Sequence, residues 1–192
     1  MQLKYLDIMK QELKVVLNDD YYIQNSNMFY PNQNLESLYN RMSSIGRDLL
    51  LDTLPSIIDG TNNRITQDES EVTFGFNIKR EEEKIDFTKD GMSIYNHIRG
   101  LIPAPVGYAY LEGKKMKFHE VSIEHKECKE ESGTILGLKD ESLMVSLKDK
   151  TLFIKMLQPE GKPKMAAKDY YNGQGKKIIG KKFDEETVTI DE

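Results

Sequence analysis

Residues 93–117, SIYNHIRGLIPAPVGYAYLEGKKMK, contain the change from a helical to a strand pattern. Apolar residues at three-residue spacing predict one buried helical face, made of Tyr95, Ile98 and Leu101. Gly100 suits a left-handed helix cap, and the two prolines that follow cannot continue a helix. Alternation over 106–112 then predicts a strand, and the Glu-Gly-Lys at its end predicts a hairpin turn. We therefore expect mixed α/β structure before this junction and a small β-rich domain after it.

The second half of the chain carries strand patterns at short spacing. Five strands are predicted, at residues 106–112, 115–125, 133–138, 142–147 and 151–157, and turns that contain Gly or Asp separate them. Five short strands of this kind suit a small barrel of the OB type. A short helix is predicted over 166–171, and the tail after Phe183 is acidic.

One apolar stripe predicts a long helix near the start of the chain. Its members recur at spacings of three and four residues: Leu35, Leu38, Met42, Ile45, Leu49, and Ile57 or Ile58. Asn34 suits the N-cap, Pro55 predicts a kink or the end of the regular helix, and Gly60 stops it. Val15–Leu17 predicts a short strand before it. An apolar face of this size needs a partner. We therefore expect a homodimer through helix 35–58, or packing of residues 1–23 against it.

The composition is that of an ordinary soluble protein. Of its 192 residues, 38% are hydrophobic and 31% charged, and no apolar run approaches the roughly 18 residues that span a bilayer. Charges run through the first residues, so no secretory signal is visible. The single cysteine, Cys128, excludes an internal disulfide and fits a reducing compartment. We expect a cytoplasmic protein with no membrane partner.

The net charge of −5 is unevenly distributed. Residues 161–182 hold seven lysines against one aspartate, a local charge of +6, and three more lysines flank the predicted hairpin near Tyr108 and Tyr110. Such a basic strip can bind phosphates on an otherwise acidic molecule, and lysines without arginines suit phosphate positioning better than base reading. The alternative is a solvated lysine surface over tyrosines of the core. From the residues alone the two interpretations carry equal weight.

Three separated stretches resemble one known family. They are GRDLLLDTLPSIIDGTNN at 46–63, IRGLIPAPVGYAYLEGKKMKF at 98–118 and LQPEGKPKMAAKDYYNG at 157–173. They occur in the order found in the methionyl-tRNA formyltransferase family, and the resemblance runs from about Leu35 to Lys182. The chain departs from the family pattern at Phe87 and Ala104, where tryptophan is common, and the front of the family's catalytic domain is absent.

The resemblance implies an α+β chain in three parts. Residues 1–63 would be the remnant of an α/β formyltransferase domain, with a strand and a long helix, and 64–86 a linker. Residues 87–192 would form an OB-like, tRNA-binding C-terminal domain with an acidic tail. The family transfers a formyl group from 10-formyltetrahydrofolate to initiator methionyl-tRNA in translation initiation. The residues that the resemblance and the basic patches nominate for tRNA binding are Lys79, Arg80, Lys114, Lys115, Lys117, Lys162, Lys164, Lys176 and Lys177.

No catalytic residue can be assigned to this chain. Formyl transfer to an amine needs a base and donors for the developing oxyanion, which the family supplies as Asn, His and Asp on its first domain. The sequence contains no Asn-x-His pair, and Asp7 is followed by Ile8-Met9 where the family has Thr-Gly. We therefore expect that the chain alone binds no cofactor, and whether it is itself an enzyme stays open. The alternative function is a non-catalytic RNA-binding or regulatory module derived from a formyltransferase.

A metal site is not predicted either. His119 and His125 share a strand face but lie six residues apart, which matches no metal-ligand spacing. A place on the surface of a strand is the better interpretation for both.

Overall fold

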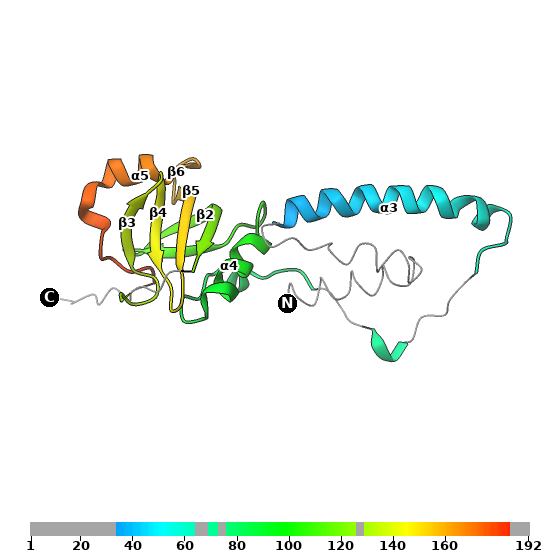
Figure 1. Ribbon diagram of the computed structural model, residues 1–192, viewed down its shortest axis with the longest axis horizontal. Coiled ribbons are helices and arrows are strands. Elements are labelled where there is room, and N and C mark those ends of the chain that lie inside the picture. Colours follow the sequence, from blue (N-terminus) through cyan, green and yellow to red (C-terminus); the bar gives the residue numbers. More distant parts are fainter. Residues whose placement is uncertain (1–33, 64–68, 73–75, 126–128, 185–192) are drawn as a thin grey trace. The chain divides into compact units, whose positions relative to one another are not determined.

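The computed structural model describes residues 34–63, 69–72, 76–125 and 129–184, and of residues 71, 175 and 176 the backbone alone (Figure 1). The chain divides into two units, residues 1–77 and 78–192. Four features expected from the sequence lie outside the described residues: the strand at Val15–Leu17, the packing of residues 1–23, Cys128, and the tail after Asp184.

The first unit contains the long helix α3, Leu35–Ile58, which confirms the helix predicted from the apolar stripe. Asn34 is the N-cap, and its side-chain oxygen accepts a hydrogen bond from the Ser37 N–H at 2.9 Å. Pro55 lies inside the helix, which continues to Ile58 before Gly60 takes a positive φ of 76°. A short 3₁₀ helix, η1 (Glu69–Glu71), follows.

The second unit is a sheet with helices at its ends, which confirms the α+β class (Figure 1). Its helical elements are η2 (Arg80–Glu83), α4 (Gly91–Gly100), α5 (Ala167–Gln174) and η3 (Gly175–Ile178). Its strands are β1 (Tyr108–Leu111), β2 (Lys114–Glu124), β3 (Ile135–Lys139), β4 (Ser142–Ser146), β5 (Thr151–Pro159) and β6 (Met165–Ala166). The first five strands and α5 correspond to those predicted from the sequence.

The sheet is antiparallel, with the strand order β1-β2-β5-β4-β3 and with β6 paired to β5. Two-residue turns with positive φ at both positions join β1 to β2 and β3 to β4, at Glu112-Gly113 and Asp140-Glu141. This backbone matches the right-handed twist of the strands that it connects. A register shift in β2 between Phe118 and Val121 marks a bulge, which increases the local twist.

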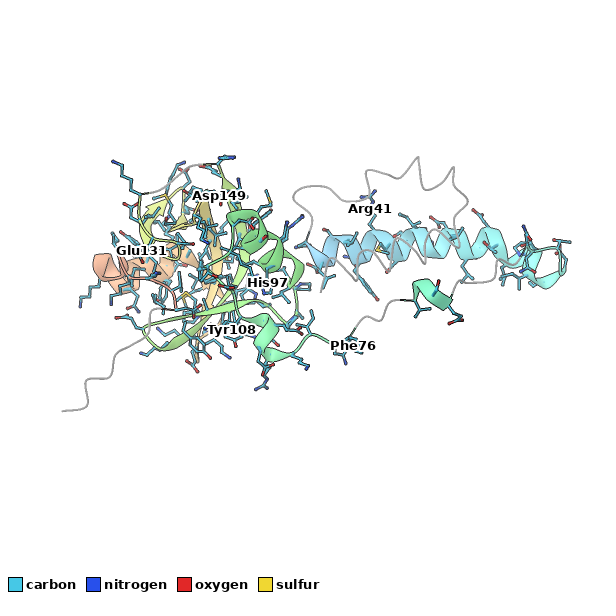
Figure 2. The ribbon with its side chains drawn as sticks, turned by 90° about the horizontal axis from the view of Figure 1, so that it is seen from below. Arg41, Phe76, His97, Tyr108, Glu131 and Asp149 are labelled. Carbon is cyan, nitrogen blue, oxygen red and sulfur yellow. The ribbon has the colours of Figure 1, made fainter. Side chains whose placement is uncertain are left out.

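Asp90 is the N-cap of helix α4, and its carboxylate accepts a hydrogen bond from the Ser93 N–H at 2.9 Å. The Gly91 N–H donates to Asp149 Oδ1 at 2.8 Å, so the loop between β4 and β5 lies beside α4 (Figure 2). The expected left-handed cap at Gly100 is wrong, because Gly100 is the last helical residue and Leu101 caps the helix in the right-handed region. The Leu101 N–H reaches the carbonyl of Ile98 at 3.0 Å, which satisfies the helix end without a positive φ. The peptide bonds before Pro103 and Pro105 are cis.

Residues 180–184 join the two edges of the sheet. At the β3 edge, the Ile135 N–H donates to the carbonyl of Lys181 and the Gly180 N–H to that of Ile135, both at 2.8 Å. At the β1 edge, the Asp184 N–H donates to the carbonyl of Tyr110 at 2.7 Å. Edge strands otherwise present unpaired backbone groups, so this segment closes the curled sheet.

The core of the second unit lies inside this closed sheet. Its largest fully buried side chains include Phe118, Phe183, Ile85, Ile94, Ile98, Leu101, Ile135, Leu143, Leu152, Ile154 and Leu157. The Phe183 ring stacks on Phe87 at 5.6 Å and meets Phe118 edge-on at 5.3 Å. Ile85 is also fully buried, and its N–H donates to the carbonyl of Tyr108 at 2.8 Å. The last residues of the segment 64–86 thus pack with the β-rich unit.

Candidate nucleic-acid interface

The β1–β2 hairpin carries tyrosines and lysines on its outer face. Tyr108 lies opposite Lys117 and Tyr110 opposite Lys115, and residues that face each other across two strands point to the same side. The alternate positions, Ala109, Leu111, Met116 and Phe118, are buried in the core. The period of two therefore separates an apolar inner face from an outer side with Lys115 and Lys117, on which Tyr108 is only 8% exposed and Tyr110 is half-buried.

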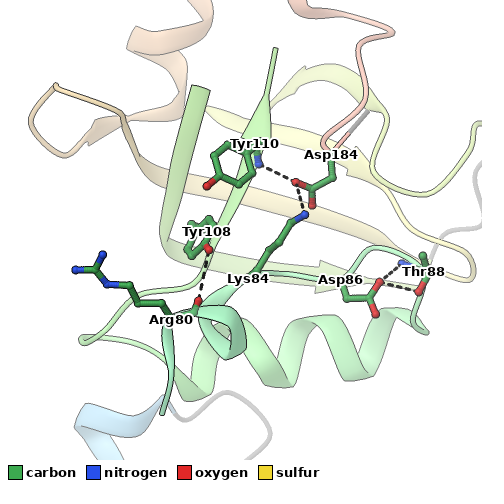
Figure 3. Close-up of polar contacts among 7 residues, drawn as sticks. All are labelled: Arg80, Lys84, Asp86, Thr88, Tyr108, Tyr110 and Asp184. Carbon is green, nitrogen blue, oxygen red and sulfur yellow. Dashed lines mark hydrogen bonds and ion pairs between the residues drawn. The ribbon is translucent and has the colours of Figure 1, made fainter. Parts of the chain in front are cut away.

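Lysine ammonium groups lie over the tyrosine rings of this face. Lys115 Nζ is 4.1 Å from the centroid of the Tyr108 ring and 6.0 Å from that of Tyr110. Lys84 Nζ lies 5.7 Å from the centroid of the Tyr110 ring and is paired with Asp184 (Figure 3). Cation–π contacts of this kind hold an ammonium group at a fixed place on the surface without neutralising its charge.

The turn between β5 and β6 adds two lysines to the same surface. The Lys115 N–H donates to Glu160 Oε2 at 3.1 Å, and the Glu160 N–H donates back to the carbonyl of Lys115 at 2.8 Å. The Gln158 side chain donates to the carbonyl of Lys162 at 3.0 Å, which ties this turn to the neighbouring strand. Lys115 and Lys117 lie on the outer side of the hairpin, Lys114 is exposed at the start of β2 opposite Leu111, and the charge of Lys164 acts on His119 together with that of Lys117. We call these lysines and Lys162 the hairpin face: Lys114, Lys115, Lys117, Lys162 and Lys164.

The lysines of the hairpin face affect the pKa of His119. Its Nε2 lies 3.2 Å from Gln158 Oε1. Burial lowers the pKa of the His119 imidazole below its ordinary value, the hydrogen bond to Gln158 opposes this, and the charges of Lys164 and Lys117 lower the pKa further. A lowered pKa favours the neutral imidazole, so His119 adds little positive charge to the face.

Lys79 and Arg80 lie at the start of η2, next to the hairpin face. The Tyr108 hydroxyl donates to the carbonyl of Arg80 at 3.4 Å, so η2 meets β1 on its outer side (Figure 3). Both side chains are exposed. Burial, and then the neighbouring Tyr110, raise the pKa of Tyr108, and Glu83 and Glu81 contribute in the same direction. The basic residues of η2 are thus mixed with carboxylates.

The basic strip predicted over 161–182 is not one surface. Lys168 pairs with Glu141 and Lys182 with Glu131, each at 2.6 Å, and Lys181 pairs with Glu112. Lys176 and Lys177 belong to η3, which packs against α5 and β3 rather than against β2. Lys177 is exposed, and the side chain of Lys176 lies outside the described residues. Of the six of these lysines whose side chains the structure describes, Lys162 and Lys164 join the hairpin face, and Lys181 pairs with Glu112 at the turn of the hairpin.

Lys84 lies beside the hairpin face but was not among the tRNA-binding residues predicted from the sequence. Its position among Lys79, Arg80 and three glutamates resembles a solvated linker. The available signal was the alternation Lys84-Ile85-Asp86-Phe87, which places Lys84 on the outer side of a segment whose apolar residues are buried. That segment forms a parallel bridge between Lys84 and Tyr108.

Other kinds of site find no support within the described ranges. No cluster of three or more His, Cys, Asp or Glu side chains there is placed to hold a metal ion. His97 lies on α4, and burial lowers the pKa of its imidazole (Figure 2). Across the part of the chain that the structure covers, every helix is too short or too polar to cross a membrane.

The family follows from comparison with known sequences. Residues 77–175 match the model of the formyl transferase C-terminal domain, so the chain belongs to this family. Curated relatives named methionyl-tRNA formyltransferase include those of Streptococcus agalactiae serotype III (42% identical over 153 residues), Lysinibacillus sphaericus (43% over 148) and Staphylococcus aureus strain MW2 (37% over 153). These matches cover 76–79% of this chain and 47–49% of each relative, so the chain spans about half the length of the relatives. The resemblance of the sequence to the C-terminal part of methionyl-tRNA formyltransferases is confirmed.

Solved structures show the same fold at lower identity. A HypX variant from Aquifex aeolicus aligns with a TM-score of 0.57 at 18% identity, over 69% of this chain and 24% of HypX. HypX in complex with tetrahydrofolic acid aligns with a TM-score of 0.56 at 16% identity, over 69% and 23%. At these identities the likeness shows the fold alone.

Proposed function

We propose that this chain supplies the tRNA-binding part of a methionyl-tRNA formyltransferase. The observation that carries the proposal is the hairpin face, where Lys115 lies over the Tyr108 ring and four further lysines belong to the same hairpin or to the neighbouring β5–β6 turn, on a domain of the formyl transferase family. Positive grooves beside aromatic side chains are the usual means by which OB-type barrels bind nucleic acid. Lysine contacts to phosphates position a nucleic acid and carry no sequence information directly.

The proposed partner is initiator methionyl-tRNA, and the proposed compartment is the cytoplasm, where translation begins. Lys79 and Arg80, next to β1, extend the contact, and Lys176 and Lys177 on η3 supply a separate one. Residues 64–86 serve in this proposal as the linker between the end of a catalytic domain, 1–63, and the tRNA-binding domain, 87–192.

Formyl transfer itself requires residues outside this chain in our proposal. The sequence holds no Asn-x-His pair, and the formyl donor, 10-formyltetrahydrofolate, is bound only when the catalytic part is present. The activity assay is transfer of a labelled formyl group to methionyl-tRNA by the 192-residue chain. We expect no product above background. Turnover at the rate of a full-length relative would contradict this division of labour.

The binding test uses the full chain and fluorescently labelled initiator tRNA in an anisotropy titration. We expect saturable binding that the double change Lys115→Ala and Lys164→Ala weakens at least about tenfold, since two phosphate contacts are lost. The matched control is Lys139→Ala with Lys168→Ala, which removes two lysines that pair with carboxylates around β3 and β4. Equal losses of tRNA affinity in the two double variants would contradict the proposed site, because they would show a nonspecific effect of charge.

We also propose that α3 associates with a second copy of the chain. Its exposed apolar side chains include Leu50, Leu51, Leu54, Ile57 and Ile58, and Leu38 is its one buried residue among those described. Apolar surface of this extent marks an association site. Sedimentation velocity is expected to show a dimer that Leu51→Glu with Leu54→Glu converts to a monomer. A wild-type monomer at micromolar concentration would overturn this part of the proposal.

A further inference from the structure

The Lys84–Asp184 ion pair lies at the edge of the hairpin face, beside Tyr110. Lys84 Nζ is 3.4 Å from Asp184 Oδ1, and the same oxygen accepts a hydrogen bond from the Tyr110 N–H at 3.0 Å (Figure 3). The Lys84 side chain is 46% exposed and that of Asp184 is 19% exposed. The lysine thus faces solvent, while the carboxylate sits against the strand.

Asp184 is anchored more firmly than Lys84. Its backbone N–H donates to the carbonyl of Tyr110 at 2.7 Å, and the preceding residue, Phe183, is buried in the core. The ammonium group of Lys84 sits at the end of a flexible four-carbon stem that can turn toward another anion. A half-exposed ion pair of this kind is weak in water, so a phosphate can replace the carboxylate.

An open groove of about 580 Å³ gives an anion access to this lysine. Three lysines, Lys84, Lys148 and Lys182, line it together with three carboxylates, those of Glu81, Asp86 and Asp184. Lys182 is paired with Glu131. The charge of Lys148 lies near Asp86, whose carboxylate is occupied by the Thr88 hydroxyl and N–H. A polyanion that follows the groove would therefore reach Lys84 from the solvent side.

We propose that Lys84 is a further phosphate contact of the tRNA-binding face, and that Asp184 occupies it in the RNA-free protein. A phosphodiester and a carboxylate both present two acceptor oxygens and one negative charge, and a lysine accepts either as a point charge. Asp184 then limits the affinity for RNA, since a phosphate has to displace it. This inference rests on the proposed tRNA-binding function.

The test is the change Asp184→Asn in the full chain. Asparagine keeps the oxygen that accepts from the Tyr110 N–H but removes the charge. We expect tRNA to bind at least about threefold more tightly at low salt, and the slope of log affinity against log salt to steepen by roughly 0.7–0.9, the value of one phosphate contact. The matched control is Glu141→Gln, which removes the same charge and frees Lys168 at the β3–β4 turn. We expect that control to change affinity less than twofold.

A second pair of variants assigns the effect to Lys84. In a Lys84→Ala background, Asp184→Asn is expected to give no gain, because the lysine that it frees is absent. A gain that persists there, or an Asp184→Asn protein that melts normally and binds no more tightly, would overturn the inference. If Asp184→Asn lowers the melting temperature, its binding data are set aside and the variants of Lys84 test the inference. Weaker binding by Lys84→Ala that Lys84→Arg restores supports the contact, and unchanged binding by Lys84→Ala overturns it.

The two proposals fail differently. If wild-type binding depends on the hairpin lysines but ignores Asp184, only this inference is wrong. If neither the folded wild type nor folded Asp184→Asn binds tRNA, the proposed function is wrong as well. Binding by Asp184→Asn where the wild type shows none would support both.

Discussion

Gly91, the first residue of α4, is enclosed by the loop between β4 and β5. A Cβ atom at this position would lie 2.8 Å from Asp149 Oδ1, 3.0 Å from Lys150 Cβ and 3.2 Å from Leu147 Cδ1. Asp149 cannot simply turn away, because its carboxylate accepts the Gly91 N–H. Leu147 is fully buried, so its side chain has little room to give way. The glycine is therefore required by close approach of the loop.

The change Gly91→Ala is expected to destabilise the second unit. Overpacking costs about 1–3 kcal/mol, whereas the gain in helix propensity is at most about 1 kcal/mol, so the net effect is a loss. The control is Gly173→Ala in α5, where a Cβ would meet nothing within 4 Å. It should be neutral or stabilise by about 0.5–1 kcal/mol. Urea unfolding followed by circular dichroism measures both, and equal midpoints for the two variants would contradict the packing argument.

At the level of single residues, the sequence predicted positions on the face but not their partners. Lys114, Lys115 and Lys117 could be assigned to the hairpin because a turn signal lies beside them. The pairing of Lys168 with Glu141 and of Lys182 with Glu131 could not be predicted, because only the folded sheet brings these residues together. The contacts of Lys84 could not be predicted for the same reason, because Tyr110 and Asp184 lie 26 and 100 positions further along the chain.

Elements with a strong internal pattern were predicted well. The stripe of α3 and the alternation in β2 repeat over many residues, so neighbouring positions reinforce one another, and β5 carries a continuous apolar run from Leu152 to Ile154. β6 has two residues and segment 180–184 has one apolar side chain, so neither has a period to detect. Their hydrogen bonds join segments far apart in sequence, which periodicity does not report.

Segment 180–184 makes a specific stability prediction through Phe183. The side chain is 1% exposed and contacts the rings of Phe87 and Phe118, so Phe183→Ala removes buried surface and leaves a cavity. The expected loss is about 3–5 kcal/mol in the free energy of unfolding. Ile179→Ala, at a side chain that is 41% exposed just upstream, should cost less than about 1 kcal/mol. A loss below about 1 kcal/mol for Phe183→Ala would show that this segment does not close the sheet.

At the scale of the whole molecule, the net charge is a poorer guide to a nucleic-acid partner than the charge of each surface. A net charge of −5 disfavours a nucleic-acid partner, yet β-sheet geometry concentrates lysines on one outer face. The sequence predicted that basic residues would matter and where the barrel would begin. It could not predict that the run 161–182 divides between two sides of the second unit, because that depends on the paths of β6, α5 and η3.

The central claim is that tRNA binds through phosphate contacts on the hairpin face, and the salt dependence of binding tests it most directly. Each contact releases counterions, so four engaged lysines predict a slope of log affinity against log salt of about −3 to −4. Lys114→Ala with Lys115→Ala should weaken binding and make the slope shallower by about 1.5, with little change in preference among tRNA sequences. The Lys139→Ala, Lys168→Ala control should leave the slope within about 0.5 of the wild type. Binding that ignores salt, or that keeps its full slope without Lys114 and Lys115, would contradict the account.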